Sequence, residues 1–160
     1  MKTIHISTQF TIYDHLEDCP PEIQDLMQQA IQARKKSYSP YSKFSVGAAL
    51  LLENGSTVTG SNQENACYPA GLCAERTALF YAGAQYPQET MTAMAITASA
   101  ADLETLEPVP PCGSCRQALS EYEVKQKMPL ALYFMGASGK VMYSPSVENI
   151  LPLLFTKKYL

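Results

Sequence analysis

Three cysteines and one glutamate carry the chemistry that this sequence offers. Cys73 stands two residues before Glu75, and Cys112 and Cys115 form a C-x-x-C pair far downstream. Three thiolates can bind one zinc ion. A structural zinc takes four protein ligands, whereas a catalytic zinc takes three and keeps one position open for water. Because Glu75 is not needed as a ligand, it is free to move protons, and the spacing predicts an open zinc site with its own acid/base residue.

The surroundings of these cysteines should favour thiolates. Cys73 and the Cys112/Cys115 pair each stand at a predicted helix start, where the helix dipole lowers the pKa of a thiol. Three thiolates around one dication leave a net charge near −1, which weakens the metal as a Lewis acid. Arg76 follows Glu75 directly, and we expect it to donate hydrogen bonds to the sulfurs and so tune the site.

The alternative is a structural zinc with Cys67 as the fourth ligand. Cys67 is six residues from Cys73 and forms no second C-x-x-C pair, so we expect it to be a small buried residue. A structural zinc would also leave Glu75 and Arg76 without a role. The pattern therefore favours the open site.

The overall composition is that of an ordinary folded domain. The chain has 160 residues, of which 46% are hydrophobic and 17% charged, which is typical of a single globular unit. The net charge is −3 with no basic run, which argues against a nucleic-acid partner. The amino terminus has no continuous apolar segment of signal-peptide length, and no apolar stretch is long enough to span a membrane. Five cysteines, an odd number that includes a C-x-x-C pair, favour metal binding in a reducing compartment, so we expect a cytoplasmic protein.

Hydrophobic periodicity outlines the elements that must position the cysteines. Asp18 and the prolines after it predict a helix start, and Asn54-Gly55 predicts a hairpin turn. Alternating apolar residues from Ile4 to Ile12 suggest a strand or an extended arm. Helices are expected over 19–37 and 73–83, from 112 onward, and after a capping Ser146; strands are expected over 44–52, 57–61, 91–99, 130–135 and 141–143.

This order of elements predicts an α/β fold with a mixed sheet covered by helices on both faces. We expect a three-layer α/β/α sandwich with a mixed, roughly five-stranded sheet. Residues 1–18 would form an N-terminal extension or arm, and residues 19–160 would form a single zinc-dependent domain. The two histidines, His5 and His15, lie in the arm and are expected to be solvated or interfacial.

Four segments in the same order resemble the motifs of cytidine deaminases. The stretch from Glu64 to Ala78, which reads ENACYPAGLCAERTA, resembles the active-site segment of that family, and PCGSCRQ (residues 111–117) resembles its second zinc segment. Residues 38–50 are similar to the first strand and its approach, and residues 60–65 to the ribose-binding loop. The resemblance covers about residues 20 to 155 and implies a cytidine deaminase-like fold.

By this resemblance, Cys73, Cys112 and Cys115 bind one Zn²⁺ per subunit. Glu75 would take a proton from the zinc-bound water, deliver it to ring nitrogen 3 of cytosine and assist the departure of ammonia. Cytidine and deoxycytidine would become uridine and deoxyuridine, an activity of pyrimidine salvage.

The resemblance also implies the substrate contacts. Asn62 and Glu64 would hydrogen-bond the ribose, Phe44 would line the base pocket, and the backbone of Ala74 would contact the base. Phe155 would reach the base in a neighbouring subunit, which implies a homotetramer with shared sites. From the residues alone, Asn62 and Glu64 also fit an ordinary polar loop, and Phe44 and Phe155 also fit simple packing.

Three rival functions make different demands on the chain. A deaminase of another small amine would keep the zinc site and tolerate changes around Asn62, Glu64 and Phe44, and these positions match the nucleoside pattern. An enzyme that edits RNA or DNA would want a basic face. A non-catalytic zinc-stabilised module would have four protein ligands and be indifferent to Glu75. Deamination of free cytosine nucleosides is the favoured prediction.

Overall fold

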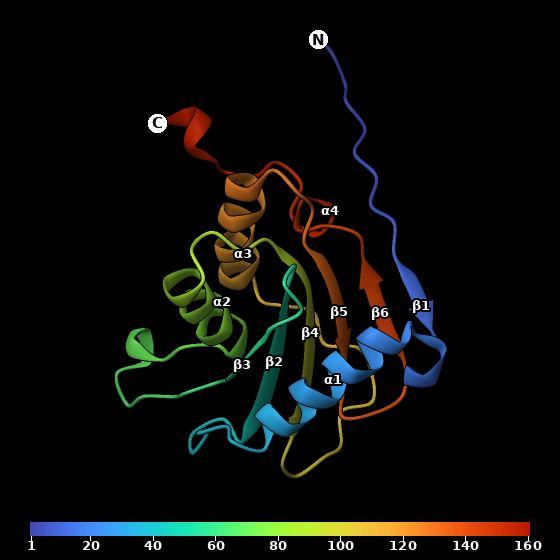
Figure 1. Cartoon of the computed structure of the whole chain (residues 1–160), viewed down its shortest axis with the longest axis vertical. Helices are drawn as coiled ribbons and strands as arrows, with labels where there is room; N and C mark the ends of the chain where they lie inside the picture. The colour runs from blue at the N-terminus through green and yellow to red at the C-terminus, as the bar shows by residue number, and fades with distance from the viewer.

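The computed structural model describes all 160 residues and is built on one mixed sheet of six strands (Figure 1). The strand order across the sheet is β1-β6-β5-β4-β2-β3. The pair β4 and β5 is parallel and every other pair is antiparallel. The strands are β1 (Thr11–Tyr13), β2 (Phe44–Leu52), β3 (Thr57–Ser61), β4 (Met91–Ala100), β5 (Ala131–Met135) and β6 (Val141–Ser144).

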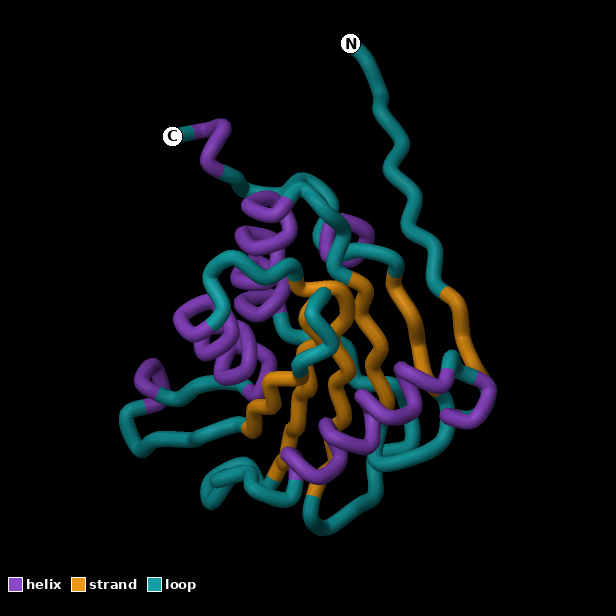
Figure 2. Tube along the Cα trace, in the orientation of Figure 1, coloured by secondary structure: helices purple, strands orange, loops and turns teal.

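Helices cover both faces of this sheet, which confirms the three-layer prediction (Figure 2). Helix α1 (Pro21–Arg34) packs on one face. Helices α2 (Ala74–Gln85), α3 (Gly113–Gln126) and α4 (Val147–Ile150) contribute to the core on the other face.

Alternation along the central strands divides the core between the two faces. In β2, Ala48 and Leu50 face the α2 side whereas Ala49 faces α1. In β4, Ile96 faces the α2 side and Ala95 faces α1. Successive side chains of a strand point to opposite faces, so a strand buried on both sides must be apolar throughout. This explains why the centres of β2 and β4, residues 48–52 and 93–96, consist of apolar residues only.

The hairpin between β2 and β3 forms where the sequence predicts it. Gly55 has φ +82°, a conformation that suits glycine. The Asn54 side chain accepts a hydrogen bond from the Ser56 backbone N–H at 2.8 Å and stabilises the turn.

Three helix boundaries differ from the prediction. Helix α1 ends at Arg34 rather than near residue 37. Asp18 does not cap α1: Pro20 is the N-cap residue, and the Asp18 carboxylate accepts from the His15 backbone N–H at 3.0 Å within a short 3₁₀ turn. Gly83 does not end α2, which continues to Gln85. A Cβ at position 83 would meet the Tyr122 ring, so this glycine permits a close approach between α2 and α3.

The prediction of about five strands was one too few. The extra strand, β1, pairs with β6 over three residues at the edge of the sheet. Residues 1–10 have no regular structure and extend away from the sheet (Figure 1). The alternating residues from Ile4 to Ile12 are exposed, so their periodicity did not mark a buried face. No helix of the chain combines the length and apolar character that crossing a membrane requires.

Candidate metal centre and active site

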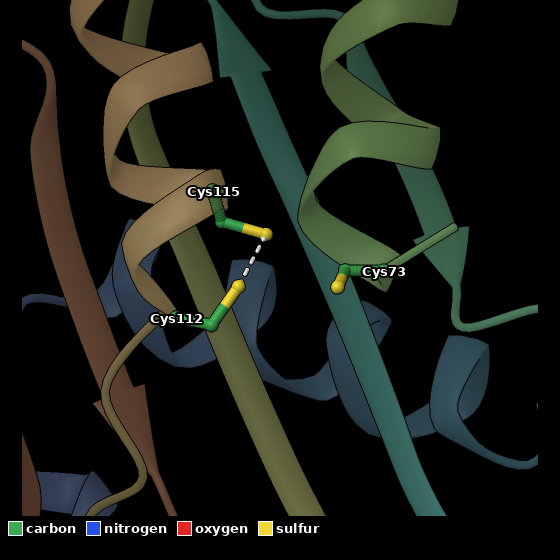
Figure 3. Close-up of side chains that lie close together, drawn as sticks. All are labelled: Cys73, Cys112 and Cys115. Carbon is green, nitrogen blue, oxygen red and sulfur yellow. Dashed lines mark hydrogen bonds between the residues drawn. The ribbon is translucent and has the colours of Figure 1, made fainter. Parts of the chain in front are cut away.

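Two helix amino termini bring the three predicted cysteines together (Figure 3). Cys73 is the N-cap residue of α2, Cys112 is the N-cap residue of α3, and Cys115 lies in the first turn of α3. Their sulfur atoms all lie within 4.8 Å of one another, and the Cys112 and Cys115 sulfurs are 3.4 Å apart. The sequence prediction of both helix starts is confirmed.

This cluster fits a zinc ion. With Zn–S bonds of about 2.3 Å, tetrahedral geometry requires sulfurs about 3.8 Å apart, which is close to the spacing that the helices impose. Thiolates are also soft ligands of the kind that zinc prefers in proteins. Cys115 is buried, Cys73 is half-buried and Cys112 is exposed. The three sulfurs therefore form a set that is covered on one side and accessible on the other.

Cys67 does not join the cluster, and the expectation that it would be buried was wrong. Its side chain is exposed. It precedes a short 3₁₀ turn, Tyr68–Ala70, that lies on the surface. Its backbone N–H donates to the Asn65 side chain at 2.8 Å, so the loop is held by polar contacts rather than by packing. The set of potential ligands thus remains at three.

Charge around the sulfurs favours a thiolate at Cys73. Hydrogen bonding from Cys115, followed by hydrogen bonding from and attraction to the Arg76 guanidinium, outweighs burial and lowers the pKa of Cys73 to about 5. The pKa of Cys115 is raised because this thiol donates to Cys73 and is itself buried. Arg76 Nη2 lies 3.5 Å from the Cys73 sulfur, and this contact raises the pKa of Arg76.

Glu75 is buried beside the cluster, in the first turn of α2. Its side chain is only 5% exposed. Burial raises the pKa of this carboxyl, and the negative charge of Cys73 adds to the effect. A carboxyl that holds its proton more tightly than usual is suited to act first as a base and then as an acid.

Close contact between β3 and α2 fixes the position of Glu75 relative to the sheet. A Cβ at Gly60 would collide with the Ala74 carbonyl and lie 2.6 Å from the Ala78 nitrogen. The Thr77 hydroxyl lies 3.0 Å from the Cys73 carbonyl and 3.3 Å from the Ser61 carbonyl. Neither Gly60 nor Thr77 stands out in the sequence as a positioning residue. Only their contacts identify them.

Asn62 lies where β3 meets the loop, and its amide is already engaged. Its Oδ1 accepts from the Ser37 hydroxyl at 2.6 Å and from the Val46 N–H at 2.8 Å. Its Nδ2 donates to the Phe44 carbonyl at 2.9 Å. One N–H of the amide remains for a ligand.

Glu64 holds a neighbouring loop in the same way. Its carboxylate accepts from the backbone N–H groups of Tyr41 and Ser42 and from the Ser42 hydroxyl. The Ser42 contact is the main reason that the pKa of Glu64 is lowered. A carboxylate has about four acceptor positions, so Glu64 can still receive a hydroxyl donor.

A hollow of about 410 Å³ connects these polar groups to the metal centre. Asn62, Glu64, Cys73 and Arg76 are among its lining residues. The predicted ribose loop and the first zinc ligand, Cys73, therefore share one surface depression.

Three of the predicted substrate-binding residues, Phe44, Ala74 and Phe155, do not line this hollow. Phe44 is half-buried at the start of β2, and Ala74 is fully buried. Phe155 is 58% exposed and stacks on Tyr159 with ring centroids 5.9 Å apart.

Helix α3 holds the C-terminal segment that carries Phe155. The Arg116 guanidinium donates to the carbonyls of Pro111 and Ile150 at 2.8 and 3.1 Å. The Gln117 amide donates to the Phe155 carbonyl at 2.9 Å. The roles of Arg116 and Gln117 could not be predicted, because Ile150 and Phe155 lie more than 30 residues away in the chain.

Buried Glu123 completes this attachment. Its carboxylate accepts from the N–H groups of Leu130, Val147 and Glu148 at 2.8 to 2.9 Å. Two of these groups belong to the first turn of α4, so Glu123 fixes the start of that helix.

Comparison with known proteins gives one consistent result. Residues 20–130 match the family model described as the cytidine and deoxycytidylate deaminase zinc-binding region. The chain is 50% identical to a cytidine deaminase of Halalkalibacterium halodurans over 133 residues, which are 83% of this chain and 93% of that relative. It is 38% identical to a cytidine deaminase of Sporosarcina psychrophila over 137 residues, 86% of this chain and 93% of the relative.

Solved structures give the same answer. The crystal structure of cytidine deaminase from Burkholderia pseudomallei superposes with a TM-score of 0.72 at 40% identity, covering 82% of this chain and 97% of that one. The enzyme from Mycobacterium tuberculosis superposes with a TM-score of 0.63 at 30% identity, covering 82% and 95%.

Proposed function

The chain belongs to the cytidine and deoxycytidylate deaminase family, and we propose that it hydrolyses cytidine and deoxycytidine to uridine and deoxyuridine with release of ammonia. The observation that carries this proposal is the cluster of three cysteine sulfurs within 4.8 Å of one another, with buried Glu75 on the helix that Cys73 begins. Zinc bound there supplies the acidity that makes water a nucleophile at neutral pH.

Glu75 moves the protons of this reaction. Its carboxylate takes a proton from the attacking water and gives it to ring nitrogen 3 while oxygen bonds to ring carbon 4. It then helps to protonate the amino group, so that the carbon–nitrogen bond breaks and ammonia leaves. The raised pKa of the buried carboxyl supports this role, because one residue must act as base and then as acid in each turnover.

The predicted substrate residues have distinct tasks in this proposal. Glu64 accepts a hydrogen bond from a ribose hydroxyl, and Asn62 donates its remaining N–H. Phe44, whose carbonyl is fixed by Asn62, packs against the base. The Ala74 backbone, held close to β3 by Gly60, contacts the polar edge of the base.

Phe155 completes the site of a neighbouring subunit in a homotetramer. Two observations support this: the ring is exposed, and its segment is fastened to α3 rather than mobile at the end of the chain. Such a site would be incomplete in the monomer. We place the working enzyme in the cytoplasm, because all five cysteines are free thiols and three of them must stay reduced to bind metal.

The domain division forms part of the proposal. Residues 19–160 would act as one deaminase domain, with residues 1–18 as an extension. The family match that begins at residue 20 supports this boundary.

Ammonia release from a panel of cytidine, deoxycytidine, cytosine, cytidine monophosphate and adenosine tests the proposal, with the Glu75→Gln variant beside the parent. We expect release from the two cytosine nucleosides alone, and loss of that release in the variant. Activity on another amine of the panel would redirect the substrate assignment. A zinc-loaded protein that is silent throughout would leave a structural zinc module as the better description.

A further inference from the structure

The N-terminal arm is attached to the protein by an unusual contact just before β1. The β1–β6 register pairs Thr11 with Tyr143, so Gln9 faces Pro145. Proline has no backbone N–H, and the ladder cannot continue through it in the ordinary way. The Asn149 side chain takes its place. Its Oδ1 accepts from the Gln9 N–H at 3.1 Å, and its Nδ2 donates to the Gln9 carbonyl at 2.9 Å.

Asn149 is itself fully engaged. Its Nδ2 also donates to the Ser144 hydroxyl at 2.9 Å, and its backbone N–H donates to the Ser146 hydroxyl at 3.0 Å. The amide therefore joins three pieces of chain: the arm at Gln9, the end of β6, and α4. We call the pair of hydrogen bonds between Gln9 and Asn149 the arm clamp.

The arm clamp acts on the helix that leads directly into the segment carrying Phe155. Helix α4 ends at Ile150, and residues 151–155 follow it. Within this segment Leu153 has φ +63°, a left-handed conformation that is unfavourable for a non-glycine residue. A strained turn persists only when its surroundings hold it. Four contacts hold this region. The arm clamp and Glu123 hold α4, Arg116 binds the Ile150 carbonyl, and Gln117 binds the Phe155 carbonyl.

The arm also lies beside the segment beyond the clamp itself. Ile6 and Thr8 line one broad hollow together with Pro152 and Leu154. Phe10 lines a second hollow with Pro110, which belongs to the loop leading to Cys112. Figure 1 shows the two termini at the same end of the molecule. The family match begins only at residue 20, so the arm is an addition outside the matched region.

From these contacts we infer that the N-terminal arm positions Phe155 for the site it completes, with Asn149 as the positioning residue. This inference rests on the proposed function of Phe155. It assigns to the arm a role in substrate binding rather than in proton transfer. Loosening the arm clamp removes one of these attachments, so α4 and the strained turn after it should become more mobile and substrate binding should weaken, without a change in the chemical step.

Substitutions at Gln9 test the inference at one position. Gln9→Pro removes the N–H that donates to Asn149, whereas Gln9→Ala keeps the backbone and changes only a side chain that takes no part in the clamp. Gln9→Pro should raise KM for cytidine about fivefold, the value of one hydrogen bond, with kcat within about twofold of the parent. Gln9→Ala should match the parent. Asn149→Ala is a second variant that removes both hydrogen bonds from the other side.

Hydrogen exchange of the amides of residues 151–159 gives a readout independent of catalysis. We expect faster exchange there in Gln9→Pro and Asn149→Ala, and no change in Gln9→Ala. In a Phe155→Ala background, Gln9→Pro should produce no further rise in KM. The inference would be overturned if hydrogen exchange of residues 151–159 were the same in Gln9→Pro as in the parent. It would also be overturned if Gln9→Pro raised KM as much in the Phe155→Ala background as in the parent. If the parent had no deaminase activity, the proposed function would be wrong. Hydrogen exchange would then still show whether the arm holds residues 151–159.

Discussion

The guanidinium of Arg76 lies against the sulfur of Cys73, with Nη2 3.5 Å from Sγ, and its Nε is buried without a partner. Both residues belong to the start of α2, three positions apart, so one helical turn brings them together. A cation in this position offsets part of the negative charge that three thiolates bring to a zinc site.

Removing this cation should weaken the metal centre. We expect Arg76→Ala to lower zinc affinity by about tenfold, in the range found for groups that support metal ligands, and to reduce activity while the protein stays folded. Chelator competition measures the affinity and thermal unfolding checks the fold. Lys125→Ala removes an exposed cation over the Tyr122 ring and serves as the control. Parent-like affinity and activity in Arg76→Ala would remove its tuning role.

Glu75→Gln should abolish turnover while preserving the structure. The amide has nearly the shape of the carboxyl but cannot take a proton, so kcat should fall by about a thousandfold or more, as for loss of general acid/base catalysis. Zinc content and the thermal transition should remain those of the parent. Single-turnover assays with cytidine give the rate, and substantial residual turnover would contradict the proton-transfer role.

Thiol reactivity should separate the five cysteines into three classes. In the zinc-loaded protein we expect one fast thiol, Cys67, because it is exposed and outside the cluster. Chelation should expose the cluster thiols, since metal protects its ligands: Cys73 first, because its pKa is lowered to about 5, and Cys115 last, because it is buried and its pKa is raised. Cys19 should react only on unfolding, because burial, followed by the charges of Asp18 and Glu17, raises its pKa to about 11 and the thiolate is the reactive form.

A timed reaction with a chromogenic disulfide measures these classes, and Cys67→Ser identifies the fast one. If the fast thiol persists in Cys67→Ser, or if chelation exposes no new thiols, the three-cysteine assignment is wrong.

Gly60→Ala should disturb the contact between β3 and α2. The added Cβ would lie 2.6 Å from the Ala78 nitrogen and against the Ala74 carbonyl, and backbone atoms cannot move aside cheaply. Overpacking of this kind typically costs about 1 to 3 kcal/mol. We expect urea unfolding to show a loss in that range. Gly113→Ala is the matched control for stability, because a Cβ there meets nothing within 4 Å; equal stabilities of the two variants would contradict the contact argument.

Glu123→Gln should destabilise the attachment of α4. The buried carboxylate accepts three backbone N–H donors, and an amide would turn an NH₂ group toward at least one of them. Loss of a charged acceptor together with an unsatisfied donor costs about 3 kcal/mol. Thermal and urea unfolding measure the loss, with exposed Glu121→Gln on the same helix as the control. A variant as stable as the parent would show that Glu123 is dispensable.

The cysteine cluster and the main layers of the fold could be predicted from local features of the chain. Cys73, Cys112 and Cys115 could be recognised because their ligand chemistry and their helix starts are local: a cap residue and a C-x-x-C spacing depend on a few neighbours. The central strands could be recognised because burial on both faces demands mostly apolar residues. These signals lie within short stretches of chain.

Other features depend on contacts between residues far apart in the chain, and these appear only in the tertiary structure. Cys67 is exposed because its loop is held by polar contacts away from the core, which its residue type does not reveal. Residues 11–13 became a sixth strand because β6 offered a free edge. In the sequence, Glu123 and Asn149 look like ordinary polar helix residues. In the folded chain Glu123 binds the start of α4, and Asn149 binds the arm at Gln9. Such roles arise when hydrogen-bonding groups far apart in sequence meet, and no local pattern encodes that meeting.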